Sequence, residues 1–166
     1  HRGRGLVIAG PRQPAEVHAA VAMINASYGN AGATVGYIPD DVRASHTEAM
    51  TQLAAAMNAG TVDTLLVLGG NPVYNAPADL DFAAALGKVQ NSFHLGLYRD
   101  ETARACRWHA PMAHTFETWS DARAWDGTAS LVQPLIEPMF GGKTVSEVLA
   151  AALGTTLPKA YDLVRA

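Results

Sequence analysis

The stretch Thr64-Leu-Leu-Val-Leu-Gly-Gly-Asn-Pro-Val-Tyr-Asn-Ala-Pro77 decides the fold, because an apolar run leads straight into a pair of glycines. The run at residues 65–68 is typical of a strand that is covered on both faces in the interior of a parallel sheet. Gly69-Gly70 allows a sharp turn, and Asn71-Pro72 favours an extended or turn conformation. Ligands bind at the carboxyl ends of such strands. The loop therefore lies where a binding site would be.

The segments around this stretch alternate between strand and helix patterns. Apolar runs predict strands over residues 5–9, 34–38, 62–68, 93–98 and 106–109, and helical spacing predicts helices over residues 15–28, 45–60 and 78–86. This alternation favours crossover connections and a parallel sheet. We therefore expect an α/β fold with a Rossmann-like, doubly wound, mainly parallel sheet and flanking helices.

Two of the expected helices carry further signals. Ser45 and Glu48 form a capping box at the start of the second helix. Apolar residues at helical spacing give each helix one face for the core. These residues are Val17, Val21 and Ile24 in the first helix, and Met50, Leu53 and Met57 in the second.

The pattern changes after Tyr98. Residues 100–105 predict a short helical turn, whereas residues 114–142 have no sustained period although they are rich in aromatic side chains. A long aromatic loop in a compact domain is more often functional or docked than free. A helix over residues 144–153 and a last turn near 158–164 follow. We expect a Rossmann-like domain over residues 1–113 and a long irregular extension over 114–166 that packs on it without being an independent domain.

Composition narrows the function classes. Hydrophobic residues make up 49% of the 166 positions, charged residues make up 16%, and the net charge is −3. The pI is near 6.0, and the one concentration of basic residues is the scatter Arg99, Arg104 and Arg107. Nucleic acid is therefore not an expected partner. The low charge fraction suggests that a partner covers part of the surface.

The cysteine content and the start of the chain add two expectations. Cys106 is the only cysteine, which excludes an internal disulfide and a cluster held by four thiolates of this chain. No apolar run reaches the length of a transmembrane helix, so direct membrane insertion is not expected. The chain opens at His1-Arg2-Gly3 without a methionine, which suggests a processed or excised piece.

The glycine loop, Gly69, Gly70, Asn71 and Pro72, has two interpretations. Its backbone N–H groups, with a helix dipole behind them, could cradle a nucleotide. It could equally be an ordinary tight turn, because isolated glycine motifs have many false positives.

Other polar residues also allow a functional and a structural interpretation. Cys106, His109 and His114 have spacings that a metal could use, but strand alternation sends Cys106 and His109 to opposite faces, so packing is favoured. His94, inside an apolar strand, is expected to be a hydrogen-bonded core histidine. A set of carboxylates could do acid–base chemistry, although a solvated or capping role is favoured; the set is Glu117, Asp121, Asp126 and Glu137.

Residues 64–111 resemble the third domain of the molybdopterin oxidoreductases. In that family a strand leads to Gly-Gly-Asn-Pro, a helix and another strand follow, and Glu-Thr-Ala precedes a proline by eight residues. This chain has Gly69-Gly70-Asn71-Pro72, Glu101-Thr102-Ala103 and Pro111 at that spacing. Where the catalytic family usually has an aspartate and small aliphatic residues, this chain has Arg107 and Trp108-His109-Ala110. These differences change the packing next to the loop.

The later segment resembles a narrower branch, the large iron–sulfur subunit of the alternative complex III type. The matching residues run from Phe116-Glu117 through Trp119 and Asp126-Gly127-Thr128 to Gln133-Pro134-Leu135-Ile136. In that branch a molybdopterin-oxidoreductase-like region precedes a ferredoxin-like region with several clusters, and the pterin and molybdenum are thought to be absent.

The resemblance implies one of two functions. In the first, the chain is a non-catalytic scaffold domain in the iron–sulfur subunit of a membrane-associated, quinol-oxidising electron-transfer complex. It then carries no cofactor, iron–sulfur clusters belong to other parts of the parent protein, and its partners are that iron–sulfur region and the other subunits. The location implied is the extracytoplasmic (periplasmic) face of the membrane. In the second, Gly69, Gly70, Asn71 and Pro72 contact a molybdopterin guanine dinucleotide in an active molybdoenzyme. In neither case is the chain expected to catalyse a reaction alone.

Overall fold

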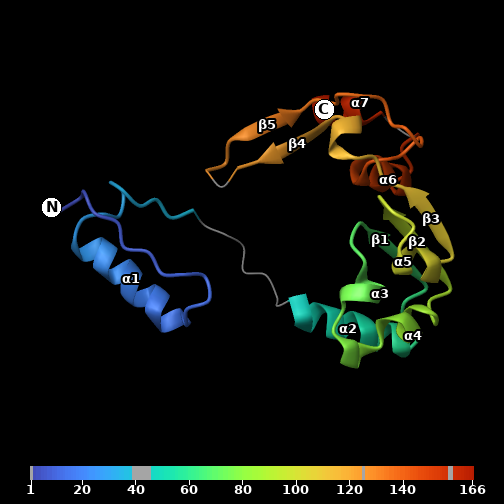
Figure 1. The fold of residues 1–166 in the computed structure, drawn as a ribbon, viewed down its shortest axis with the longest axis horizontal. Coiled ribbons are helices and arrows are strands. Elements are labelled where there is room, and N and C mark those ends of the chain that lie inside the picture. The colour runs from blue at the N-terminus through green and yellow to red at the C-terminus, as the bar shows by residue number, and fades with distance from the viewer. Residues whose placement is uncertain (1, 39–45, 125, 157–158) are drawn as a thin grey trace. The chain divides into compact units, whose positions relative to one another are not determined.

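The computed structural model describes residues 2–38, 46–124, 126–156 and 159–166. Internal contacts divide the chain into two units, His1–Val42 and Arg43–Ala166, and each is described by itself (Figure 1). The expected boundary between residues 113 and 114 remains a prediction. The expected capping residue Ser45 lies outside the described residues.

The first unit is built around one helix, α1 (Ala15–Ser27), close to its expected bounds. The expected strand at residues 5–9 does not form. Instead, the Asn25 side chain of α1 pairs with the backbone of Val7, accepting from its N–H (3.1 Å) and donating to its carbonyl (2.8 Å). A buried amide thus takes the place of a neighbouring strand for this segment.

The other expected strand of the first unit, residues 34–38, is also absent. Its only β contact is an isolated bridge between Ala31 and Val35. Nor does α1 bury the expected apolar face, because Val17 and Ile24 are exposed and Asn25 is its buried residue. Helical spacing predicted the helix correctly here, but not which face is covered.

The second unit is a mixed α/β structure with a three-stranded parallel sheet and flanking helices, which confirms this part of the expectation. The strands β1 (Thr64–Leu68), β2 (Asn91–Gly96) and β3 (Trp108–Pro111) pair in the order β1-β2-β3. Both pairs are parallel. The helices between and before them are α2 (His46–Asn58), α3 (Pro72–Asn75), α4 (Phe82–Leu86) and α5 (Glu101–Ala105).

The interior strand is β2, not β1 as expected. β1 pairs with β2 alone, and Leu66 in the middle of β1 is 41% exposed. In β2, by contrast, Ser92 and the consecutive residues His94, Leu95 and Gly96 are buried. β1 is therefore an edge strand of this unit's sheet, and β2 has a neighbour on each side.

The core of the second unit lies between α2, α4 and the sheet. Met57 and Ala85 are fully buried there, and Met50 and Leu53 pack beside them, so the expected apolar face of α2 is confirmed. Cys106 belongs to the same cluster, which confirms the packing interpretation of the thiol. Removal of this apolar surface from water is the main force that holds the helices on the sheet.

The helix expected over residues 78–86 is divided in two. A 3₁₀ turn, η1 (Ala78–Leu80), ends at Asp81, which has a left-handed backbone with φ 42°. The Asp81 carboxylate then accepts from Ala84 N–H (3.4 Å) and caps α4. One residue therefore ends the first helical piece and begins the second.

The C-terminal part contains more regular structure than expected. An antiparallel hairpin, β4 (Ser120–Arg123) with β5 (Ala129–Val132), occupies part of the segment expected to be irregular. Its turn uses Gly127 at φ 88°, with Asp126 accepting from Thr128 N–H (2.9 Å). Asp-Gly between strands is a known hairpin signal. A 3₁₀ turn, η2 (Thr115–Glu117), precedes the hairpin.

Two helices follow the hairpin, α6 (Val145–Ala152) and α7 (Ala160–Arg165). Both correspond to expected helical segments, and Thr144 with Glu147 forms a capping box on α6. Lys143 joins this part to the end of β3 through backbone hydrogen bonds with Pro111 and Ala113. None of the helices in the described ranges is long and apolar enough to cross a membrane.

Candidate functional site

The glycine loop lies at the carboxyl end of β1, as expected. Gly69 N–H donates to the Leu95 carbonyl of β2 (2.8 Å), which anchors the start of the turn. Gly69 and Gly70 have φ values of 80° and 74°, and an added Cβ at either position would meet nothing within 4 Å. Glycine is therefore favoured here by backbone conformation and not by crowding.

Asn71 ties the loop to α5. Its Nδ2 donates to Glu101 Oε2 (2.7 Å), and its Oδ1 accepts from the Thr102 hydroxyl (2.7 Å) and the Thr102 N–H (3.2 Å). The same hydroxyl accepts from Val73 N–H (3.0 Å). Two short segments of chain, residues 71–73 and 101–102, are thus held together by one amide and one fully buried hydroxyl.

This contact also fixes the charge of Glu101. The hydrogen bond from Asn71 is the largest cause that lowers the pKa of the Glu101 carboxyl, and a backbone hydrogen bond acts in the same direction. Glu101 therefore remains a carboxylate and an acceptor to a lower pH than an ordinary glutamate.

Two histidines, His94 and His109, form a hydrogen-bonded pair that contacts the loop. His94 is fully buried, which confirms the expectation of a core histidine. Its Nε2 lies 3.2 Å from the Gly70 carbonyl oxygen, and its Nδ1 lies 3.1 Å from His109 Nδ1. Because a carbonyl only accepts, Nε2 carries a proton. A neutral His94 then accepts at Nδ1 from the Nδ1–H of His109.

Two neighbours define the environment of this pair. A Cβ on Gly96 would lie 2.4 Å from His94 Cε1, so only glycine leaves room for the ring. Asp100 Oδ1 lies 3.9 Å from His94 Nδ1 and also caps α5 by accepting from Ala103 N–H (2.9 Å). Burial is the largest cause that lowers the pKa of His109, and the nearby Asp100 carboxylate opposes it.

The structure does not bring the candidate metal ligands together. Cys106 lies in the core, where burial raises the pKa of its thiol. His109 contacts His94, whereas His114 accepts from Phe116 N–H (3.2 Å) and packs edge-on against the Phe116 ring. Across the parts of the chain that the structure describes, no group of three or more His, Cys, Asp or Glu side chains could hold a metal ion.

The candidate carboxylates differ in their burial and in their hydrogen bonds. Glu117 is buried and accepts from His114 N–H (2.9 Å) and Met139 N–H (3.3 Å), while Asp126 holds the hairpin turn. A hydrogen bond from Thr128 N–H lowers the pKa of Asp126. The capping interpretation is therefore confirmed for these two residues. Asp121 and Glu137 are exposed.

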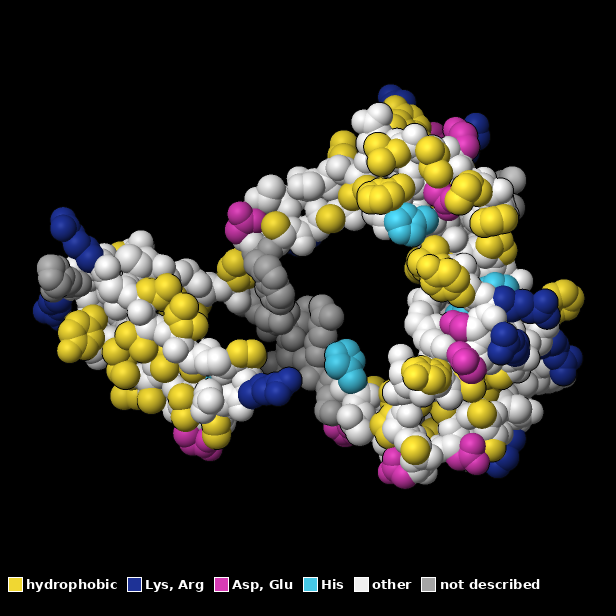
Figure 2. Space-filling model, in the orientation of Figure 1, with side chains coloured by type: hydrophobic (Ala, Val, Ile, Leu, Met, Phe, Trp, Pro, Cys, Tyr) yellow, Lys and Arg dark blue, Asp and Glu magenta, His cyan; other side chains and the backbone are white. Residues whose placement is uncertain are grey.

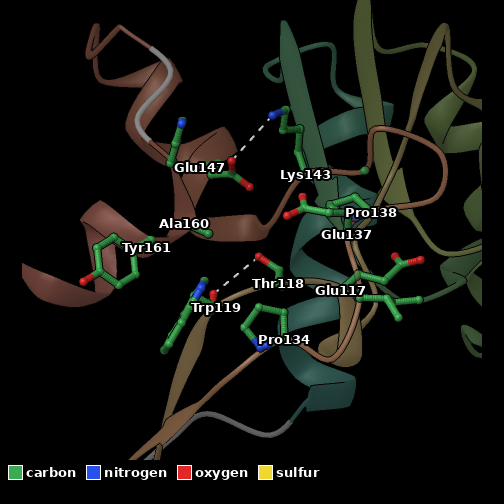
Figure 3. A pocket seen from close by; sticks show the side chains of 13 residues that line it. Glu117, Thr118, Trp119, Pro134, Glu137, Pro138, Lys143, Glu147, Ala160 and Tyr161 are labelled. Atoms are coloured by element: carbon green, nitrogen blue, oxygen red, sulfur yellow. Dashed lines mark hydrogen bonds and ion pairs between the residues drawn. The ribbon is translucent and has the colours of Figure 1, made fainter.

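Glu117 also lines a pocket of about 370 Å³ in the C-terminal part. Figure 3 shows that Trp119 and Tyr161 also line this pocket. Their rings pack edge-on, with centroids 5.2 Å apart. The second buried carboxylate there, Glu147, accepts from Thr144 N–H (2.8 Å) and faces Lys143 at 3.6 Å. Both buried carboxylates already have partners within the protein, so neither is free for acid–base chemistry.

Two features of the site could not be read from the sequence pattern. The pairing of His94 with His109 depends on the register between β2 and β3, and the basic residues Arg99, Arg104 and Arg107 share a pocket with His109. The only sequence signal for this pocket was the short spacing of the three arginines along the chain. No protein-family model matches the chain, and no curated protein matches it either.

Proposed function

We propose that this chain is a non-catalytic scaffold domain in the iron–sulfur subunit of a membrane-associated, quinol-oxidising electron-transfer complex. The observation that carries the proposal is the closure of the glycine loop. The Asn71 side chain, which a bound nucleotide would need, makes its hydrogen bonds to Glu101 and Thr102. The Gly70 carbonyl is likewise taken by His94. The loop therefore works as a turn that ties β1 to β2 and α5.

A second observation supports docking to other proteins. Large apolar side chains are exposed in the second unit, among them Tyr98, Trp108 and Phe140, the last at 80%. Exposed aromatic residues are enriched where protein surfaces meet. The partners in this proposal are the iron–sulfur region of the same parent protein and the other subunits of the complex.

The remaining parts of the proposal follow from the resemblance to the alternative complex III type. Iron–sulfur clusters belong to other parts of the parent protein, the complex lies at the extracytoplasmic face of the membrane, and the complete sheet is Rossmann-like and doubly wound. The parallel order of β1, β2 and β3 supports the last point.

A second candidate function is binding of a molybdopterin guanine dinucleotide. The observation in its favour is the space around Gly69 and Gly70, where nothing lies within 4 Å of an added Cβ. A ligand could approach the backbone closely there. This function would require Asn71 to exchange Glu101 and Thr102 for the ligand.

Metal and pterin analysis of the parent protein tests the proposal. The full-length protein would be purified with its membrane partners, and iron, molybdenum and pterin would be measured in the same sample. The scaffold function predicts several iron atoms per chain with neither molybdenum nor pterin. One molybdenum atom per chain would refute it and favour the second candidate, and absence of iron would also refute the scaffold function.

A further inference from the structure

A basic pocket lies beside α5 and β3 in the second unit. It has a volume of about 350 Å³ and is lined by Arg99, Ala103, Arg104, Cys106, Arg107 and His109. Figure 2 shows dark-blue side chains gathered over the region where Figure 1 draws α5 and β3. The pocket is distinct from the glycine loop, although His109 contacts His94, which in turn contacts Gly70.

The fold brings three positive charges together here. Arg99 follows β2, Arg104 lies in the last turn of α5, and Arg107 comes directly before β3. All three are exposed, and within the described ranges none of their guanidinium groups forms an ion pair with a carboxylate. Like charges at one concave site repel each other, so the pocket is complementary to an anion.

The type of basic residue narrows the class of anion. Arginine presents a planar fork of N–H donors that matches the oxygens of phosphate or carboxylate in a bidentate manner. Because neutral His109 donates from Nδ1 to His94, its Nε2 is an acceptor, and the donors for the anion are therefore the three arginines. The volume is at the lower end of the range for small-molecule sites, which favours a compact ligand.

We propose that this pocket binds a small molecule through a phosphate or diphosphate group, held by Arg99, Arg104 and Arg107 with His109 at its edge. The proposal does not depend on the scaffold function. Nucleic acid is the poorer fit, because the basic residues are confined to one pocket and the chain as a whole has a net charge of −3.

Calorimetric titration of the chain with inorganic pyrophosphate tests the proposal. We expect saturable binding, and about tenfold or greater weakening in Arg104→Gln and in Arg107→Gln, because each loses a charge-assisted hydrogen bond. Both side chains are exposed, so these variants should retain the wild-type melting temperature. The matched control is Arg123→Gln, which removes the same charge from β4, outside the pocket. It should bind pyrophosphate as the wild type does.

Two further arms identify the anion and its source. Citrate serves as a compact carboxylate, and vesicles containing phosphatidylglycerol present phosphate in a lipid headgroup. Vesicle binding that pyrophosphate displaces would assign the phosphate to a lipid, whereas pyrophosphate binding without vesicle binding would assign it to a soluble ligand. Both results support the pocket.

Three titration results would overturn the proposal. They are no saturable binding of pyrophosphate, tighter binding of citrate than of pyrophosphate, or an equal loss of affinity in Arg123→Gln. Nuclear magnetic resonance gives an independent readout, because pyrophosphate should shift the His109 ring resonances and leave those of His114 in place. Unchanged His109 signals at saturation would place the ligand elsewhere and also overturn the assignment.

Discussion

Replacing Thr102 with valine should weaken the attachment of the glycine loop to α5. The hydroxyl of this fully buried residue donates to Asn71 Oδ1 (2.7 Å) and accepts from Val73 N–H (3.0 Å). Valine keeps the shape but removes both bonds, each of which contributes about 1 kcal/mol. The half-buried Val73 N–H is also left without its partner, so we expect Thr102→Val to lower the free energy of unfolding by about 2–3 kcal/mol.

Urea denaturation followed by circular dichroism measures this loss, with the slope against urea unchanged so that the midpoint reports stability. Thr115→Val is the matched control, because Thr115 is exposed and should change stability by less than about 0.5 kcal/mol. If Thr102→Val is as stable as the control, the hydroxyl does not bridge the loop and α5, and the reasoning fails.

Three further predictions concern the residues around the loop. Gly96→Ala should destabilise the protein by about 1–3 kcal/mol in the same assay, because its Cβ would lie 2.4 Å from the buried His94 ring; wild-type stability would show that the ring can move. The His109 ring should titrate below the ordinary histidine pKa when followed by nuclear magnetic resonance. Its contribution to stability should then be present above the unfolded-state pKa and fall as the pH drops through the lower folded-state pKa; a raised pKa would contradict the described burial. Cys106 should react with a thiol reagent much more slowly in the native protein than in the unfolded chain, since it is buried and its pKa is raised, and equal rates would be the contrary result.

Local patterns predicted the central part of the fold well. The apolar run before Gly69 became β1, the next apolar run became β2, and the helical pattern over residues 144–153 became α6. These elements are specified by residues near one another in the chain, and sequence patterns report such interactions directly.

The failures involve contacts between distant residues. The segment at residues 5–9 has a strand pattern, but Asn25 satisfies the backbone of Val7 in place of a neighbouring strand. An apolar run shows that a segment can pair, not which group pairs with it. The hairpin at Asp126-Gly127 did have a local turn signal, but the residues beside it show no sustained apolar period.

The candidate site was only partly predictable for the same reason. The position of the loop follows from the strand before it, but its closure depends on Glu101 and Thr102, which lie 30 and 31 residues away from Asn71. The partnership of His94 and His109 depends on strand register. Neither contact has a signature in the spacing of residues along the chain.

Titration of the chain with guanosine, followed at the Asn71 side-chain amide resonances, tests most directly the claim that the glycine loop is closed. Guanosine carries the base and ribose without phosphate, so the basic pocket should not bind it. Because Asn71 already donates to Glu101 and accepts from Thr102, we predict no saturable shift of its amide signals. A saturable shift of those signals would contradict the account and show that the loop opens to a nucleotide.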